Sequence, residues 1–171
     1  MSQVLFNSRI IETIKERLIG HGETISVAES VTSGLIQFAL SEAENAANFY
    51  QGGITAYNLG QKSRHLLIDP VHALSCNSVS EKIARDMALN VCRLFTSDWG
   101  VGITGYASPV PESGNKLFAW YAISCRGKIV MTKKVTPKKD EPPKIQQLYV
   151  THLLKDLAGN LKSYRDGGRK R

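Results

Sequence analysis

The chain has 171 residues, of which 42% are apolar, 22 are basic and 15 are acidic, so its formal net charge is +7. A chain of this size can bury a core of its own, which excludes wholesale disorder and collagen-like repeats. No apolar stretch approaches the roughly 20 residues that cross a bilayer, and the first residues do not resemble a signal peptide. The cysteines, Cys76, Cys92 and Cys125, are widely spaced, so we expect reduced thiols in a cytoplasmic protein, with no disulfide or metal site.

The positive charge is concentrated in the C-terminal third. Residues 126–144 hold seven basic and two acidic residues, and residues 162–171 hold five and one. Three interpretations compete: a solvated strand edge followed by a frayed end, a surface that attracts a phosphorylated small molecule, and a nucleic-acid surface. The aromatic residues are not interleaved with the basic run, which disfavours nucleic acid.

The first half of the chain predicts helices that alternate with strands. Apolar residues at helical spacing predict a helix over residues 3–19, which His21 and Gly22 end. The elements expected next are a buried strand at 24–28, a polar turn into a helix at 35–43, a strand at 52–57, and a short helix at 61–67 that Asp69-Pro70 closes.

The second half continues the alternation. The Ser-x-x-Glu spacing of residues 78–81 is that of a capping box and predicts a helix to about residue 96. The elements expected next are a strand at 99–105, a loop at 106–115, a hairpin of strands 117–124 and 128–135, a polar break at 137–143 and a helix at 144–161. This pattern predicts one α/β domain over residues 1–161, an α/β/α sandwich with a mixed, mostly parallel sheet, and a basic disordered tail over 162–171.

Three loops that follow predicted strands carry the candidate chemistry. Because ligands collect at the carboxyl ends of strands in open α/β sheets, the loops 29–34, 57–62 and 104–115 should converge on one site. The first loop places the hydroxyls of Ser30, Thr32 and Ser33 at the start of a helix, where N–H groups can bind a phosphate or an oxyanion. Ordinary helix capping explains the same residues.

The second and third loops each have two interpretations. Lys62 near a helix start should have a lowered pKa and could act as a general base toward a serine, or it could simply face solvent. Tyr57 beside it could serve the site or pack in a half-buried position. In the third loop, Thr104-Gly105 would let main chain approach a ligand closely, and a tight structural turn explains it equally well.

Taken in order, these segments resemble the C-terminal domain of the CinA family of competence/damage-inducible proteins, across about residues 5–160. The matching motifs are Val-Ala-Glu-Ser-Val-Thr-Ser-Gly at 27–34, Gly-Gly-Ile-Thr-Ala-Tyr at 52–57 with Lys62, Val-Ser-Glu at 79–81 and Gly-Ile-Thr-Gly at 102–105. Stand-alone members of that family include nicotinamide mononucleotide deamidases. The resemblance implies an α/β sandwich that forms a homodimer or larger homo-oligomer and hydrolyses the carboxamide of this small nucleotide, with no metal and no organic cofactor. The sequence itself leads us to expect no nucleic-acid and no membrane partner.

The resemblance also implies roles for individual residues. Ser30 would be the nucleophile, Lys62 would take its proton, and Tyr57 would orient or relay that proton. The N–H groups near Thr32 to Gly34 would bind an oxyanion or the nucleotide phosphate. The residues it implies for substrate binding are Glu29, Thr32, Ser33, Gly34, Thr104 and Gly105.

The sequence departs from the family pattern in the binding loops. Val31 stands where the family usually has cysteine, and Ser33 stands where it has glycine. The segment 58–61 lacks the usual asparagine and glutamate, and Pro111 stiffens a loop that is normally rich in glycine. These changes leave open a paralogue that hydrolyses another amide, or one that binds a nucleotide or metabolite without turnover.

Overall fold

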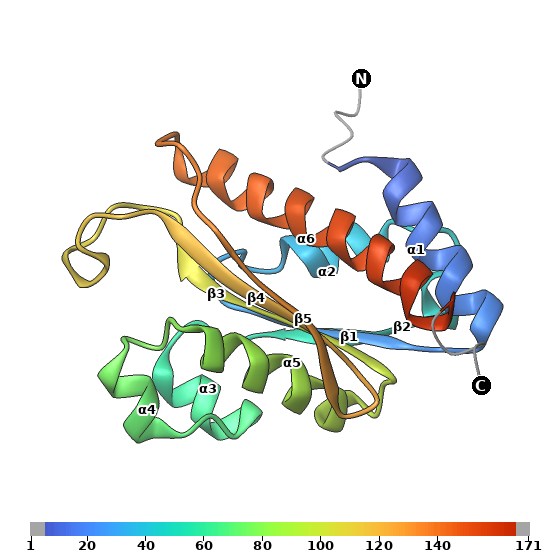
Figure 1. Ribbon diagram of the computed structural model, residues 1–171, viewed down its shortest axis with the longest axis horizontal. Coiled ribbons are helices and arrows are strands. Elements are labelled where there is room, and N and C mark those ends of the chain that lie inside the picture. The colour runs from blue at the N-terminus through green and yellow to red at the C-terminus, as the bar shows by residue number, and fades with distance from the viewer. Residues whose placement is uncertain (1–5, 167–171) are drawn as a thin grey trace.

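The computed structural model describes residues 6–166, and for residues 164–166 it describes only the main chain. A sheet lies between two layers of helices, with α1, α2 and α6 on one face and α3, α4 and α5 on the other (Figure 1). The helices are α1 (Ser8–His21), α2 (Leu35–Ser41), α3 (Leu59–Leu66), α4 (Pro70–Ser75), α5 (Glu81–Phe95) and α6 (Pro142–Asp166). The strands are β1 (Ile25–Glu29), β2 (Tyr50–Thr55), β3 (Trp99–Tyr106), β4 (Phe118–Cys125) and β5 (Lys128–Val135).

The sheet has five strands in the order β2-β1-β3-β4-β5. Strand β1 pairs in parallel with both β2 and β3, whereas β4 pairs antiparallel with β3 and β5. The predicted α/β class, the mixed sheet and the hairpin of β4 and β5 are therefore confirmed. Because β1, β2 and β3 run in one direction, the loops that follow them leave the sheet at the same edge.

Close packing of α5 on the sheet depends on two glycines of β3. A Cβ atom at Gly100 would lie 2.1 Å from the Ala88 carbonyl oxygen, and one at Gly102 would lie 2.4 Å from that of Ala84. Both carbonyl oxygens belong to α5, so this helix rests directly on the strand main chain. The contact fixes the start of α5 near the end of β3, where the third loop begins.

Side-chain caps place two helix starts later than the sequence pattern predicts. Helix α1 begins at Ser8 because the Asn7 side chain accepts a hydrogen bond from the Arg9 N–H, while residues 3–5 lie outside the described part. Helix α5 is capped by Ser80, whose hydroxyl accepts from the Ile83 N–H. The capping-box prediction from Ser78 was wrong in register, because this residue takes a left-handed conformation in the preceding turn.

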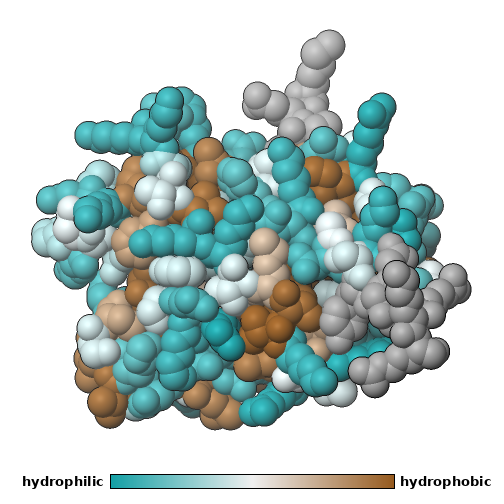
Figure 2. Space-filling model, viewed as in Figure 1, coloured by the Kyte–Doolittle hydropathy of each residue, from teal (hydrophilic) through white to brown (hydrophobic). Residues whose placement is uncertain are grey.

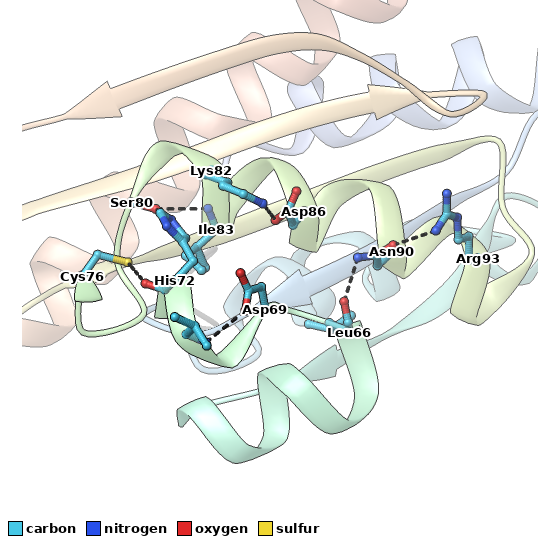
Figure 3. A network of polar contacts seen from close by, with 11 residues as sticks. Leu66, Asp69, His72, Cys76, Ser80, Lys82, Ile83, Asp86, Asn90 and Arg93 are labelled. Atoms are coloured by element: carbon cyan, nitrogen blue, oxygen red, sulfur yellow. Dashed lines mark hydrogen bonds and ion pairs between the residues drawn. The ribbon is translucent and has the colours of Figure 1, made fainter. Parts of the chain in front are cut away.

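Helix α4 is absent from the sequence prediction, which had Asp69-Pro70 closing a helix. Asp69 instead caps a new helix by accepting from the Val71 N–H, and Pro70 occupies its first position, where the missing N–H costs nothing. Figure 3 shows how the three helices of this layer are tied together. The Asn90 amide donates to the Leu66 carbonyl at 2.7 Å, and the His72 ring contacts the Ser80 hydroxyl at 3.1 Å.

The C-terminal helix is longer than predicted, since α6 runs from Pro142 to Asp166. The expected tail therefore begins inside a helix: residues 162–166 are helical, and 167–171 lie outside the described residues. Within residues 6–166, no helix is long and apolar enough to cross a membrane. The surface is largely hydrophilic, with hydrophobic side chains gathered near α3 and α4 at the lower left of Figure 2. The exposed apolar residues at the end of α3 and in α4 are Leu67, Val71 and Leu74.

Candidate functional site

The three loops that follow β1, β2 and β3 meet at a cavity of about 640 Å³, as the sequence predicted. Each loop supplies part of the lining, and α3, the turn between α4 and α5, and the start of α6 close the remaining sides. The cavity is therefore built at the carboxyl ends of parallel strands, where α/β folds place their ligands. Lining residues from these elements include Ser30, Tyr57, Lys62, Asn77, Gly105 and Pro142.

Ser30 and Lys62 form the centre of this site. The Lys62 Nζ atom donates a hydrogen bond to the Ser30 Oγ atom at 2.9 Å, and both side chains are buried. Ser30 follows β1 directly, and its N–H donates to the Ile103 carbonyl, which extends the pairing with β3 by one residue. Lys62 lies in the first turns of α3, a helix that Asn58 caps. The structure therefore brings these two side chains together, and the roles that the resemblance implies for them stay predictions.

Burial changes the ionisation of this lysine. Lys62 is 2% exposed, and its removal from water lowers its pKa to about 8, against a weaker opposing influence of Cys76. An amine with a pKa of about 8 is partly uncharged near neutral pH, so it can accept a proton from a neighbouring hydroxyl. A serine beside an uncharged buried amine has the arrangement of an activated nucleophile.

Tyr57 does not occupy the position that the resemblance implied. It lies beyond the end of β2, whose last residue is Thr55, and its side chain is 72% exposed. Lys62 contacts the main chain of Tyr57 and not its phenol: the Lys62 Nζ atom donates to the Tyr57 carbonyl oxygen at 3.5 Å. Tyr57 is among the residues that line the cavity, and no hydrogen bond joins its phenol to Ser30 or Lys62, so the arrangement does not support a proton relay through it.

Glu29 takes the position that we expected a ligand anion to occupy. Its buried carboxylate accepts hydrogen bonds from the main-chain N–H groups of Gly34, Ile36 and Gln37 at 2.8–3.1 Å, and from the Thr32 hydroxyl at 2.5 Å. These are the donors at the start of α2 that would otherwise lack partners. Assigning Glu29, Thr32 and Gly34 to substrate binding was therefore wrong: an internal carboxylate fills this helix start and fixes the turn that holds Ser30.

Of the other residues expected to bind substrate, Gly105 lines the cavity, whereas Ser33 and Thr104 do not. Ser33 is exposed, has a φ of 51°, and lies outside the cavity lining. Thr104 is fully buried, and its hydroxyl donates to the Ser78 carbonyl at 2.9 Å, so it holds the α4–α5 turn and does not face a ligand. Gly105 does line the cavity. A Cβ atom there would lie 2.5 Å from the Phe118 carbonyl oxygen, so pairing with β4 also requires a glycine at this position.

Several residues that line the cavity could not be predicted from the local sequence pattern. Asn77 and Ser78 come from the turn between α4 and α5, which follows a helix that the pattern missed. Gln146 lies on α6, 115 residues along the chain from Val31, to whose carbonyl oxygen its side-chain amide donates at 2.7 Å. Glu112 lies in the loop after β3, where nothing distinguished it from a solvated acid. Among the described residues, no cluster of histidine, cysteine and acidic side chains could hold a metal ion.

Replacing Glu29 with glutamine tests its structural role. We expect the free energy of unfolding to fall by about 2–3 kcal/mol, because charge-assisted hydrogen bonds to three main-chain donors are weakened and the amide brings a donor of its own. Chemical denaturation of the two proteins measures this difference. Glu42→Gln, at the exposed end of α2, is the matched control and should change stability by less than about 0.5 kcal/mol. Equal effects of the two substitutions would contradict the role of Glu29.

Comparison with known proteins gives relatives of one kind. A family model described as the CinA C-terminal domain matches residues 7–161. A CinA-like protein from Prochlorococcus marinus is 37% identical over 110 residues, which cover 61% of this chain and 26% of that protein. A CinA-like protein from Synechocystis is 40% identical over 88 residues, covering 52% of this chain and 21% of that protein. The chain thus spans about a quarter of the length of these curated relatives.

A solved structure covers nearly the whole fold. The competence-damaged protein (CinA) superfamily protein from Enterobacter cloacae superposes with a TM-score of 0.85 at 26% sequence identity, covering 94% of this chain and 95% of that one. A competence/damage inducible protein from Agrobacterium tumefaciens superposes with a TM-score of 0.81 at 24% identity, covering 95% of this chain and 99% of that one. The arrangement of sheet and helix layers is therefore shared across the full domain.

Proposed function

The chain belongs to the CinA C-terminal domain family, and from that premise we propose that it is an amidohydrolase that cleaves the carboxamide of a small molecule and releases ammonia. The observation that carries the proposal is the buried pair of Ser30 and Lys62, 2.9 Å apart, at the wall of a cavity large enough for a small metabolite. Nicotinamide mononucleotide is the substrate that the resemblance implies, and it is the reference compound for an assay.

The first half of the proposed reaction forms an acyl-enzyme. Uncharged Lys62 accepts the Ser30 hydroxyl proton while the Ser30 oxygen attacks the carboxamide carbon, giving a tetrahedral oxyanion. When that intermediate collapses, the carbon–nitrogen bond breaks and the Lys62 ammonium gives its proton to the departing nitrogen, which leaves as ammonia. Lys62 is then uncharged again, and Ser30 carries the acyl group as an ester.

The second half returns the enzyme to its starting state. Water attacks the ester carbon while Lys62 accepts one of the water protons. As the ester bond breaks, Lys62 returns this proton to the Ser30 oxygen and the carboxylic acid leaves. One buried amine therefore serves as base and acid in both halves, which suits a pKa near the working pH.

We infer that the main-chain N–H of Val31, the residue that follows the nucleophile, donates a hydrogen bond to the oxyanion. Two donors further along the turn are engaged: the Ser33 N–H donates to the Ser30 carbonyl, and the Gly34 N–H donates to Glu29. Val31 lines the cavity, and its N–H donates to no acceptor among residues 6–166. A main-chain donor at this position, fixed before the reaction, stabilises developing negative charge without reorganisation.

Ammonia release from the purified protein is the direct test of the proposal. Nicotinamide mononucleotide, nicotinamide riboside and nicotinamide are compared at equal concentration with an enzyme-coupled ammonia readout. Turnover of at least one of these amides supports the amidohydrolase. Binding measured as a rise in melting temperature, without ammonia from any of them, would instead support the alternative of a ligand-binding member of the family that does not turn over its ligand.

The pH dependence should follow the ionisation of Lys62. With an amide that does not titrate between pH 6 and 10, we expect kcat/KM to rise about tenfold per pH unit below about pH 7, to reach half of its maximum near pH 8 and to level off above about pH 9. The uncharged amine is the active form, so activity increases as the proton leaves. An ordinary lysine, with its pKa of 10.5, would instead give a rise that continues beyond pH 10, and that profile would contradict the role of Lys62 as base.

We also propose, from the family resemblance, that the chain forms a homo-oligomer. The exposed Leu67, Val71 and Leu74 of the α3–α4 region give it physical support, because each is more than 70% exposed and they lie within eight residues of one another. Homo-oligomer formation stays a prediction, as does the cytoplasmic location.

A further inference from the structure

The charge of the cavity lining is the starting point. Among residues 6–166, the lining includes one basic and one acidic side chain, Lys62 and Glu112. No basic residue in the described part of the C-terminal third is among the lining residues, and three of them, Lys116, Lys134 and Lys139, line a separate cavity of about 260 Å³. The described lining of the cavity therefore lacks the cations that would be needed if that basic surface attracted a phosphorylated ligand into the site.

The proposed chemistry makes the lining still less suited to an anion. Lys62 must be uncharged to accept the Ser30 proton, and its lowered pKa makes this form more populated than it is in an ordinary lysine. When it is uncharged, the remaining charge on the lining is the Glu112 carboxylate. The reactive state of the cavity is thus negative, and a phosphate dianion placed in it would be repelled.

The N–H groups at two helix starts beside the cavity, those of α2 and α6, have acceptors within the protein. The N–H groups at the start of α2, behind Ser30, donate to the Glu29 carboxylate. The start of α6 reaches the cavity at Pro142, and this helix opens with two prolines, which have no N–H to donate. The next two N–H groups of α6 donate to the Glu141 carbonyl oxygen. A helix start normally supplies the donors for a phosphate, and neither of these two helix starts can do so.

An aromatic wall completes the lining. Tyr106 lines the cavity and is fixed at both ends: its hydroxyl accepts from the Asn77 amide at 3.0 Å, and its carbonyl oxygen accepts from the Tyr149 hydroxyl at 2.8 Å. Tyr57, in the loop that follows β2, also lines the cavity. The face of a tyrosine ring attracts cations, and a flat ring such as a pyridinium can stack on it.

We propose that this site takes a flat carboxamide that carries no phosphate and is uncharged or positively charged, and that it selects against the phosphorylated form of the same amide. The inference rests on the proposed function and deepens it. Glu112 favours the cation, Tyr106 and Tyr57 contact the ring, and Ser30 faces the carboxamide. The substrate class is thus a pyridinium carboxamide or a neutral aromatic carboxamide, in contrast to the nucleotide that the resemblance implies.

Binding to the Ser30→Ala protein tests this selectivity without turnover. Calorimetric titration at low ionic strength compares nicotinamide riboside, which is a cation, with nicotinamide mononucleotide, which adds a phosphate. We expect the riboside to bind at least tenfold more tightly. Equal or tighter binding of the mononucleotide, or failure of the riboside to bind, would overturn the inference.

Charge recognition by Glu112 has its own matched pair of variants. In the Ser30→Ala background, Glu112→Gln should weaken riboside binding about three- to tenfold and leave the affinity for uncharged nicotinamide unchanged. Glu16→Gln, an equally exposed acid on α1 away from the cavity, should change neither affinity. A loss of riboside affinity that is equal in both variants would contradict local recognition by Glu112.

The outcomes separate this inference from the proposed function. If the riboside binds selectively and the wild-type protein releases no ammonia from the riboside, the mononucleotide or nicotinamide, the selectivity stands and the amidohydrolase proposal fails. If ammonia is released with a higher kcat/KM from the mononucleotide than from the riboside, the amidohydrolase stands and the selectivity fails.

Discussion

Replacing Ser30 with alanine is expected to reduce ammonia release by roughly 1,000-fold or more while the protein stays folded. The variant lacks the oxygen that forms the acyl-enzyme, and Lys62 loses the hydroxyl to which it is hydrogen-bonded at 2.9 Å. A 1,000-fold loss corresponds to about 4 kcal/mol of activation free energy, which is more than the loss of one ordinary binding contact. Steady-state kinetics on the amide that the wild type turns over fastest gives this ratio.

Two controls make the Ser30 result specific. Ser41→Ala removes a hydroxyl from the end of α2, where it donates to the Phe38 carbonyl, and should leave kcat/KM within about twofold of the wild type. Mass spectrometry of the wild type quenched during turnover should find one acyl group on the Ser30 peptide and none on Ser30→Ala. Full activity of Ser30→Ala would remove Ser30 as the nucleophile.

The sequence was sufficient to predict the convergence of the loops, because strand and helix alternate with clear periods and parallel strands end at one edge. This inference needs only local pattern and the general geometry of α/β sheets. The pairing of Ser30 with Lys62 came from the family resemblance, because local pattern left Lys62 open to a position facing solvent.

The role of Glu29 was beyond the sequence pattern. A helix start needs an acceptor for its N–H groups, and the pattern cannot say whether that acceptor is a ligand or a neighbouring side chain. Here Glu29 lies five to eight residues before Gly34, Ile36 and Gln37 and folds back onto all three. Only the path of the intervening turn reveals this, and the path includes Ser33 in the left-handed region, where a glycine would be the usual residue.

Adjacent residues in this turn thus have different tasks. Glu29 binds the start of α2 and fixes the backbone, and Ser30 presents its oxygen to the cavity on that fixed support. The same division explains why Thr104 is buried behind the site while Gly105 lines it. Side chains alternate between the two faces of a strand, so neighbouring residues point in opposite directions. A sequence motif therefore contains both residues that support the site and residues that take part in the reaction.

Gln146 and the α4–α5 turn were missed for a different reason. Their approach to the cavity depends on long-range packing: α6 crosses over the end of β1, and α4 exists because Asp69 caps it. Each capping interaction is ordinary by itself. Their combination at one cavity follows from the three-dimensional order of the strands, which local patterns do not encode.

Substituting Lys62 by methionine is expected to abolish turnover and at the same time to stabilise the fold. The variant lacks the base, so ammonia release should fall by roughly 1,000-fold or more. Methionine is close in length to lysine and carries no charge, so it removes the cost of burying an amine whose pKa is lowered from 10.5 to about 8. After the loss of the hydrogen bond to Ser30, we expect a net gain of about 1–2 kcal/mol in unfolding free energy at pH 7.

The pH dependence of stability identifies the cause of this gain. Between pH 8 and 10.5 the unfolded chain holds a proton on Lys62 that the folded chain has released, so the stability of the wild type rises with pH across this window. Lys62→Met lacks that rise, and its advantage over the wild type should shrink from pH 7 to pH 10. Arg64→Met, on an exposed position of the same helix, should give a difference that does not change with pH. An advantage of Lys62→Met that is constant with pH would mean that better packing, and not relief of a buried charge, stabilises the variant.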